Sequence, residues 1–245
     1  MLSMVCILIL GICIGSFLNV CIYRIPKENS IIYPNSHCIN CGYKLRVIDL
    51  IPLLSYIFLK GRCRKCKERI SIRYIIVEML NGILYLLIYL KFGFNVNSIF
   101  YCLLASLLIV ISFIDLETKY IYTSTTIIGV IIGIVYICTS YFVSNSNIIY
   151  SLLGGMIGFS IIYLIVIITK AMGEGDAEIA GICGLFVGFQ GIITTLFIAI
   201  VSAGIIASIL LILKIKDKKS EIAFGPYISL GAILFILIGE NIYFI

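Results

Sequence analysis

Long apolar runs recur along the whole chain, and they constrain its fold more than any other feature. Of the 245 residues, 62% are hydrophobic and only 12% are charged, and the mean hydropathy is +1.18. A helix needs roughly 20 apolar residues to span the core of a bilayer. We therefore expect an all-α polytopic membrane protein with about eight transmembrane helices. The candidate segments are residues 1–22, 74–90, 97–114, 121–143, 148–169, 177–190, 192–213 and 224–245, of which the sixth is short.

The basic residues predict the orientation of these segments. Eleven of the 18 Lys and Arg lie in residues 24–73, and six more follow the third, fifth and seventh segments. Short basic loops stay in the cytoplasm, so an N-terminus outside the cell places 17 of the 18 cations inside. No Lys or Arg precedes Arg24, and the first segment is therefore expected to be a retained helix and not a cleaved signal peptide. The net charge of +6 is attributed to this topology, with the lipid bilayer and not nucleic acid as the partner.

Residues 24–73 form the one long polar stretch and are the candidate for a separate module. We predict a first transmembrane helix over residues 1–23, a cytoplasmic cysteine-bearing loop over residues 24–73 and a transmembrane core over residues 74–245. Inside the loop, "VIDLIPLLSYIFL" is apolar but too short to span a bilayer, and Pro52 interrupts it. This segment is expected to lie along the membrane surface or to pack on the helices.

Two Cys-x2-Cys pairs lie in this loop. Cys38 and Cys41 occur in "HCINCG", and Cys63 and Cys66 occur in "GRCRKC". Such pairs present four thiolates to one tetrahedral ion, with the spacing of a zinc ribbon. Two structural disulfides are the alternative, which a cytoplasmic location disfavours because thiols stay reduced there. The sequence thus predicts a structural zinc ion that performs no chemistry, and His37, beside Cys38, is a less favoured ligand.

Two aspartates lie at the expected cytoplasmic edge of the membrane. Asp115 is part of "FIDLETKY" after the third segment, and Asp176 is part of "GEGD" before the sixth. Two carboxylates brought together can share one proton, so that one acts as a base on water while the other polarises a carbonyl. This is aspartyl-protease chemistry. Gly173 and Gly175 are expected to let a substrate strand or another helix approach the backbone, while either aspartate alone is also consistent with a helix-capping role.

Several stretches together make the chain resemble one family. They are "GSFLNVCIYRIP", the two cysteine pairs with "IPLLSYIFLKGRC" between them, "ISIRYIIVEML", "IDL", "GEGD" and "FGPYISLGA". With these stretches the chain resembles, over nearly its whole length, the type IV prepilin leader peptidase/N-methyltransferase family. The members of this family are GxGD-type aspartyl proteases. The resemblance implies that Asp115 and Asp176 are catalytic. It also implies a membrane enzyme of a prokaryote that cleaves the leader from prepilins or pseudopilins.

The same resemblance implies methylation of the new N-terminus with S-adenosylmethionine. Two positions depart from the family pattern: Ile121 and Tyr122 stand where the family often has Ile-Pro, and Glu178 stands where it often has Lys. Glu117, Glu174 and Glu178 are expected to be solvated flank residues, or else to attract a basic leader.

Three other functions remain open at this point. A presenilin-like intramembrane aspartyl protease shares a GxGD-like site, but this chain lacks the Pro-Ala-Leu segment of those proteins. A transporter would explain intramembrane acids, although Asp115 and Asp176 lie at the membrane edge. A zinc-dependent membrane adaptor would need the cysteine-bearing loop and not the aspartates. Glu78, an acid within a helix, is expected to pair with a neighbouring helix or with Arg73.

Overall fold

The computed structural model describes residues 2–144, 147–169, 172–214 and 223–239, and no β-strand occurs among them. Six of the described helices are long and apolar enough to cross a membrane. The prediction of an all-α polytopic membrane protein is therefore confirmed, whereas the count of about eight spans is not. The predicted cytoplasmic cations Lys170, Lys216, Lys218 and Lys219, and residues 240–245 of the last predicted span, lie outside the described residues.

The chain forms two compact units, Met1–Gly93 and Phe94–Ile245. The first unit thus contains both of the first two long helices. The boundary that the sequence placed at residue 74, before the transmembrane core, stays a prediction. Each unit has its own internal packing, and each carries one of the two candidate sites.

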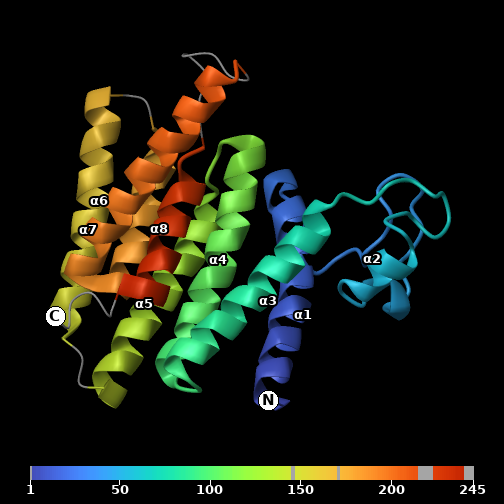
Figure 1. Ribbon diagram of the computed structural model, residues 1–245, viewed down its shortest axis with the longest axis horizontal. Coiled ribbons are helices and arrows are strands. Elements are labelled where there is room, and N and C mark those ends of the chain that lie inside the picture. The colour runs from blue at the N-terminus through green and yellow to red at the C-terminus, as the bar shows by residue number, and fades with distance from the viewer. Residues whose placement is uncertain (1, 145–146, 170–171, 215–222, 240–245) are drawn as a thin grey trace. The chain divides into compact units, whose positions relative to one another are not determined.

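In the first unit, helices α1 (Leu2–Arg24) and α3 (Arg73–Phe92) pack closely against each other (Figure 1). Glycines make this contact possible: a Cβ on Gly11 would lie 2.8 Å from the Cα of Gly82, and Gly15 meets α3 just as closely. Small residues let helix backbones approach in this way, which favours van der Waals packing within a bilayer.

The polar loop between these helices holds three short helical elements, η1 (Ile25–Lys27), η2 (Val47–Leu50) and α2 (Leu54–Phe58). The elements η2 and α2 lie within the apolar segment "VIDLIPLLSYIFL" described above. Many of its side chains face outward, and Val47 and Phe58 are 82% and 79% exposed. Apolar exposure of this extent fits a segment that lies along a membrane surface.

Glu78 joins this apolar segment to the helices of the same unit. Its buried carboxylate accepts a 2.8 Å hydrogen bond from the backbone N–H of Leu53. The expected pairing of Glu78 with a neighbouring helix or with Arg73 stays a prediction. The partner from the loop backbone is one that sequence reasoning missed.

The described part of the second unit contains five helices, and α7 is the central one. The segments α5 and α6 both pack on α7, and α8 packs on α7 and on α4. Asn95 begins the unit's first helix as a cap, because its side chain accepts a hydrogen bond from the N–H of Ser98 at 2.7 Å. The helices are α4 (Val96–Thr118), α5 (Thr123–Ser144), α6 (Ile148–Thr169), α7 (Glu174–Ile212) and α8 (Gly225–Ile238).

Helix α7 reverses its direction at Gly188, where the backbone is not helical (φ 70°, ψ −174°). A Cβ on Gly158 of α6 would lie 2.5 Å from the carbonyl oxygen of Ala180 and 2.8 Å from Cγ1 of Ile192. In one continuous helix Ala180 and Ile192 would be about 18 Å apart. The predicted sixth and seventh spans are therefore the two segments of one folded helix, and the first segment is shorter than the roughly 20 residues a span needs.

Glycine contacts also show which ends of the helices lie together. A Cβ on Gly129 of α5 would contact the side chain of Ile182, and a Cβ on Gly133 would contact that of Leu185. Because both contacts advance along the chain together, α5 runs in the same direction as the first segment of α7. Gly225, the first residue of α8, meets Ile179 near the start of α7. The starts of α5, α7 and α8 therefore gather at one end of this unit.

Candidate active site and metal site

Asp115 lies near the C-terminal end of α4 and is only 4% exposed. Its Oδ2 accepts a 3.0 Å hydrogen bond from the backbone N–H of Gly225. The amides of a first helical turn have no partner within their helix, and they favour a carboxylate. A Cβ on Gly225 would lie 2.8 Å from Asp115 Oδ2 and 3.1 Å from Cδ1 of Ile179. The glycine of "FGPYISLGA" is thus required for the close approach of α8 to Asp115, a role the sequence did not reveal.

Asp176 lies in the first turn of α7 and is 5% exposed. Its Oδ2 accepts a 3.2 Å hydrogen bond from the N–H of Gly173. Asp176 therefore caps its own helix, which is the alternative role that the sequence also allowed. It also lies within electrostatic range of Asp115. The two acids are 61 positions apart in the chain, and the fold brings them to the same end of the second unit, next to the start of α8.

Each aspartate uses one of its two carboxylate oxygens in the hydrogen bonds described above. Among the described residues, the hydrogen bonds of Asp115 and Asp176 involve Oδ2 alone, and each side chain retains a small exposed fraction. A pair of carboxyl groups arranged in this way suits general acid and general base catalysis.

The two glycines of "GEGD" have different surroundings. Among the described residues, a Cβ on Gly173 would meet Asp176 Oδ2 at 3.9 Å. A Cβ on Gly175 would lie 2.7 Å from Cβ of Ile121, in the connection between α4 and α5. Gly175 thus accommodates a connection of the same unit, while the expected approach of a substrate strand at Gly173 stays a prediction.

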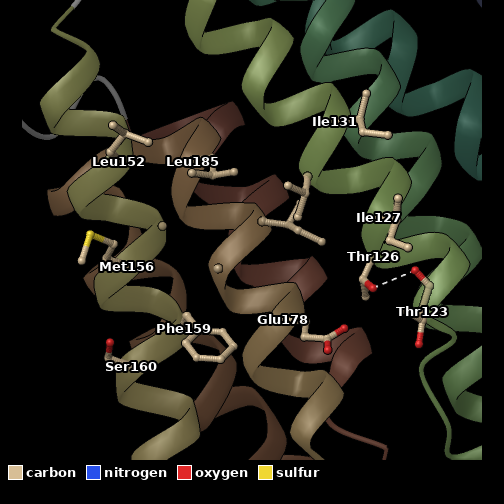
Figure 2. A pocket seen from close by; sticks show the side chains of 14 residues that line it. Thr123, Thr126, Ile127, Ile131, Leu152, Met156, Phe159, Ser160, Glu178 and Leu185 are labelled. Carbon is tan, nitrogen blue, oxygen red and sulfur yellow. Dashed lines mark hydrogen bonds between the residues drawn. The ribbon is translucent and has the colours of Figure 1, made fainter.

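The flanking acids also differ from one another. Glu117 and Glu174 are exposed, in agreement with their interpretation as flank residues. Glu178 is half-buried, and it lines an apolar groove between α5, α6 and α7 (Figure 2). Its position on α7 faces away from the aspartate pair, because side chains two residues apart on a helix point in nearly opposite directions.

The four loop cysteines of the first unit form one cluster. Their Sγ atoms all lie within 4.8 Å of one another, with 3.8 Å between Cys38 and Cys66 and 4.0 Å between Cys41 and Cys63. Zn–S bonds of about 2.3 Å in a tetrahedron place sulfur atoms roughly 3.8 Å apart. All four thiols are free and not joined as disulfides. The four Sγ atoms therefore form a donor set whose spacing fits a zinc ion.

The two cysteine pairs lie in equivalent turns. The residue after each pair, Gly42 or Lys67, adopts positive φ (67° and 60°), and the N–H of that residue donates to the carbonyl of the first cysteine. Isolated β-bridges, His37 with Lys44 and Arg62 with Arg69, close the two turns. The His37 ring contacts the carbonyl of Asn35 at 2.9 Å, and it is not part of the cluster of possible metal ligands.

Asp49 connects the two cysteine turns through a buried carboxylate. Its Oδ1 forms an ion pair with Arg64 of the second turn at 2.7 Å. Its Oδ2 accepts hydrogen bonds from Tyr43 of the first turn at 3.3 Å and from the N–H of Arg46 at 3.2 Å. The hydrogen bond from Arg64 is the largest cause that lowers the pKa of Asp49. Sequence reasoning missed this role, although a lone acid within an apolar segment was a visible signal.

These features define a class of protein, a polytopic helical membrane protein with a paired-carboxylate site and a four-cysteine loop suited to a metal. Comparison with known proteins gives the family. Residues 9–92 match the Bacterial Peptidase A24 N-terminal domain, and residues 102–208 match the Type IV leader peptidase family. The chain belongs to the type IV leader peptidase family. The two matches fall in the two compact units, one in each.

Relatives named "Prepilin leader peptidase/N-methyltransferase" align over most of the chain. The protein of Myxococcus xanthus is 32% identical over 83% of this chain, and the chain spans 62% of that protein's length. The protein of Neisseria gonorrhoeae is 29% identical, with 93% of this chain and 88% of that protein covered. The protein of Pseudomonas putida is 27% identical, with 96% and 90% covered. No solved structure matches this chain.

Proposed function

We propose that this chain is a membrane aspartyl endopeptidase that removes the leader peptide from type IV prepilins or pseudopilins and then methylates the new N-terminus. Family membership and the names of the relatives support this function. The observation that carries it is the convergence of two buried carboxylates, Asp115 and Asp176, beside the first turn of α8. Such a pair is needed by a protease and has no role in an adaptor.

Asp115 and Asp176 are the catalytic pair in this proposal. The ionised carboxylate removes a proton from the water that attacks the scissile carbonyl, while the protonated carboxyl group donates a hydrogen bond to the carbonyl oxygen. When the tetrahedral intermediate collapses, the C–N bond breaks and a proton passes to the leaving nitrogen. The N–H of Gly225 holds Asp115 in place, so Gly225 is a positioning residue.

The active site and the cysteine loop face the cytoplasm of a prokaryotic cell, with the N-terminus outside. The distribution of 17 of the 18 cations supports this orientation. It also suits the substrate, because a prepilin combines a basic leader with an apolar helix. The scissile bond between the two parts would then lie at the membrane edge, level with the aspartate pair.

The proposed cofactors have separate roles. A zinc ion held by Cys38, Cys41, Cys63 and Cys66 stabilises the loop, and its closed coordination shell leaves no position for chemistry. S-adenosylmethionine supplies the methyl group. This second cofactor is supported by the names of the relatives, and none of the described residues is assigned to it.

Replacing Asp115 or Asp176 by Asn tests the proposed function. An amide keeps the shape of the side chain but cannot exchange the proton. The rate of prepilin cleavage by each variant is therefore expected to fall by about 10²–10⁴-fold. Cleavage is measured with purified protein, and Glu174→Gln is the matched control. Substantial cleavage by either Asn variant would remove that aspartate from the mechanism.

The pH dependence of cleavage gives an independent check. The pair works when one carboxyl group is ionised and the other is protonated, so the rate is expected to follow a bell. Activity should fall at low pH when both groups are protonated, and at high pH when neither is. A rate that rises to a plateau with a single ionisation would contradict the shared-proton mechanism.

A further inference from the structure

Two buried charged side chains of the first unit take no part in the proposed cleavage, Arg24 at the end of α1 and Glu78 in α3. They are 7% and 6% exposed. Burial of a charge costs free energy unless polar groups around it compensate. Both side chains bind the backbone of the loop that connects the two helices. Two segments of the loop are therefore fixed directly to the membrane helices.

Arg24 holds a bend of the loop at residues 30–34, here called the first tip. Its guanidinium donates hydrogen bonds to the carbonyl oxygens of Ser30 at 2.8 Å and Ile31 at 3.1 Å. It also donates to the carbonyl oxygen of Pro34. The rigid fork of donors on an arginine suits such a set of acceptors. One buried side chain thus fixes both ends of the bend to the end of α1.

The first tip directs two apolar side chains outward. Within the bend, Ser30 Oγ accepts hydrogen bonds from the N–H groups of Ile32 and Tyr33, both at 3.3 Å. The side chains of Ile32 and Tyr33 are 84% and 74% exposed. A bend that is held on its inner side and apolar on its outer side indicates a surface that meets an apolar partner.

Glu78 holds the apolar segment at residues 47–58, here called the second tip, at a strained turn. Its Oε2 accepts the 2.8 Å hydrogen bond from the N–H of Leu53. Leu53 has φ 59° and ψ −52°, and the N–H of Leu54 donates to the carbonyl oxygen of Pro52 at 2.6 Å. This is the rare and strained form of the γ-turn. Such a conformation persists where the surrounding structure holds it, and the buried carboxylate supplies that hold.

The contact with Glu78 also gives the depth of the second tip. Helices α1 and α3 are antiparallel, and the loop joins their adjacent ends. Glu78 lies five residues after Arg73, the first residue of α3, which is roughly 7 Å along the helix. Because Leu53 reaches this depth, the second tip comes back beside helices that are long and apolar enough to cross a membrane. It therefore lies at the level of the membrane interface.

The chemistry of the two tips matches a lipid surface. The second tip presents Val47 and Phe58, as the first presents Ile32 and Tyr33. Aromatic and aliphatic side chains are favourable at a membrane interface, and neighbouring cations attract anionic headgroups. Exposed basic residues flank both tips, and these are Lys27, Lys44, Arg46 and Lys60. A bilayer with anionic lipids thus complements both the apolar side chains and the charges around them.

We propose that the two tips are membrane anchors that dock the cysteine loop on the adjoining bilayer surface, and that Arg24 and Glu78 set their depth. One anchor is held by α1 and the other by α3, so the four cysteines are kept close to the lipid. Arg24 and Glu78 are positioning residues in this arrangement. The proposal does not depend on prepilin cleavage, and its test needs no substrate.

Fluorescence of single tryptophans tests the depth of the tips, because the natural chain has no Trp. The full-length protein is placed in liposomes that contain anionic and brominated phospholipids. Ile32→Trp and Phe58→Trp are expected to lose fluorescence to an extent comparable with Leu10→Trp, which marks an exposed position on α1. Glu68→Trp, at an exposed polar position of the loop, is the control and should lose little.

Two results would overturn the proposal. If neither tip is quenched, protein and not lipid covers them. If Glu68→Trp is quenched as strongly as the tips, the loop has no defined anchors. Tyr33→Trp and Val47→Trp provide a second position in each tip where a first variant does not purify.

Substitution of the two buried charges tests how the tips are held. Arg24→Lys lacks the rigid fork of donors, so quenching should fall at Ile32→Trp and stay unchanged at Phe58→Trp. Glu78→Met removes the acceptor for the N–H of Leu53 and should give the opposite pattern, while Glu78→Gln keeps an acceptor oxygen and should restore it. The zinc content of each variant reports whether the cysteine turns remain folded. Equal changes at both tips, or none, would mean that these residues do not position the anchors.

The lipid composition tests the charges around the tips. When zwitterionic lipid replaces the anionic lipid, quenching at Ile32→Trp and Phe58→Trp should weaken, and quenching at Leu10→Trp should stay the same. Unchanged quenching at both tips would show that the flanking basic residues do not contribute to docking.

Discussion

The cysteine loop of the first unit and the aspartate pair of the second gather reactive groups in two different ways. In the loop, each Cys-x2-Cys pair lies in one turn, so the local backbone already places half of the ligand set. The aspartates lie on two separate helices, and the start of α8 packs against both of these helices. A short-range pattern builds the candidate metal site, whereas the packing of three helices builds the aspartate site.

The difference shows where each site is vulnerable. A structural zinc site in a small loop takes most of its folding free energy from the metal, so removal of the ligands is the direct way to disrupt it. The aspartate site depends on close approach between helices, and one added methyl group is enough to change it. Substitutions in one unit are therefore expected to affect one site and largely spare the other.

The largest effect is expected when all four loop cysteines are replaced by Ser. Metal analysis should show a fall from one zinc ion per chain to none, because structural zinc binding contributes roughly 10–16 kcal/mol in small domains. Prepilin cleavage should fall less than in the Asn variants of the aspartates, since those lie in the other unit. Zinc retained at one ion per chain would contradict the assignment. The control replaces four helical cysteines, Cys6, Cys13, Cys102 and Cys138.

A smaller effect, confined to the second unit, is expected for Gly225→Ala. The new Cβ would lie 2.8 Å from Oδ2 of Asp115, so the carboxylate must shift. A displacement of about 1 Å at a catalytic group costs on the order of 10²-fold in rate. The zinc content should stay unchanged. Gly204→Ala on α7 is the control, because nothing lies within 4 Å of its Cβ position. Wild-type cleavage by Gly225→Ala would mean that this contact does not position Asp115.

The smallest effect is expected for Asp49→Asn in the first unit. The substitution removes the ion pair with Arg64, whose side chain is 43% exposed, so solvent screening keeps the loss of stability small. Because the pKa of Asp49 is lowered in the folded chain, this stabilisation is present at neutral pH and is lost only as the pH falls below about 3.9. Competition with a chelator should show slightly weaker zinc binding, and cleavage should be unaffected. Glu28→Gln in the same loop is the control. A wild-type zinc affinity would show that Asp49 does not support the cysteine turns.

The sequence by itself determined the features that depend on short-range spacing. Apolar runs of bilayer length predict membrane helices wherever they lie in a protein. The pairs in "HCINCG" and "GRCRKC" predict a metal site because two turns already hold the ligands. The acids of "FIDLETKY" and "GEGD" stand out because charge is rare in so apolar a chain.

Only the tertiary structure decided which helix faces meet. Hydropathy separated two apolar segments within residues 177–213, but only the folded chain shows that α7 turns back at Gly188 and packs both segments against α6. The contact of Gly225 with Asp115 joins residues 110 positions apart, and the groove beside Glu178 needs three helices at once. These features depend on how closely glycines let particular helices approach, and this distance is set by packing in three dimensions and not by any local pattern of residues.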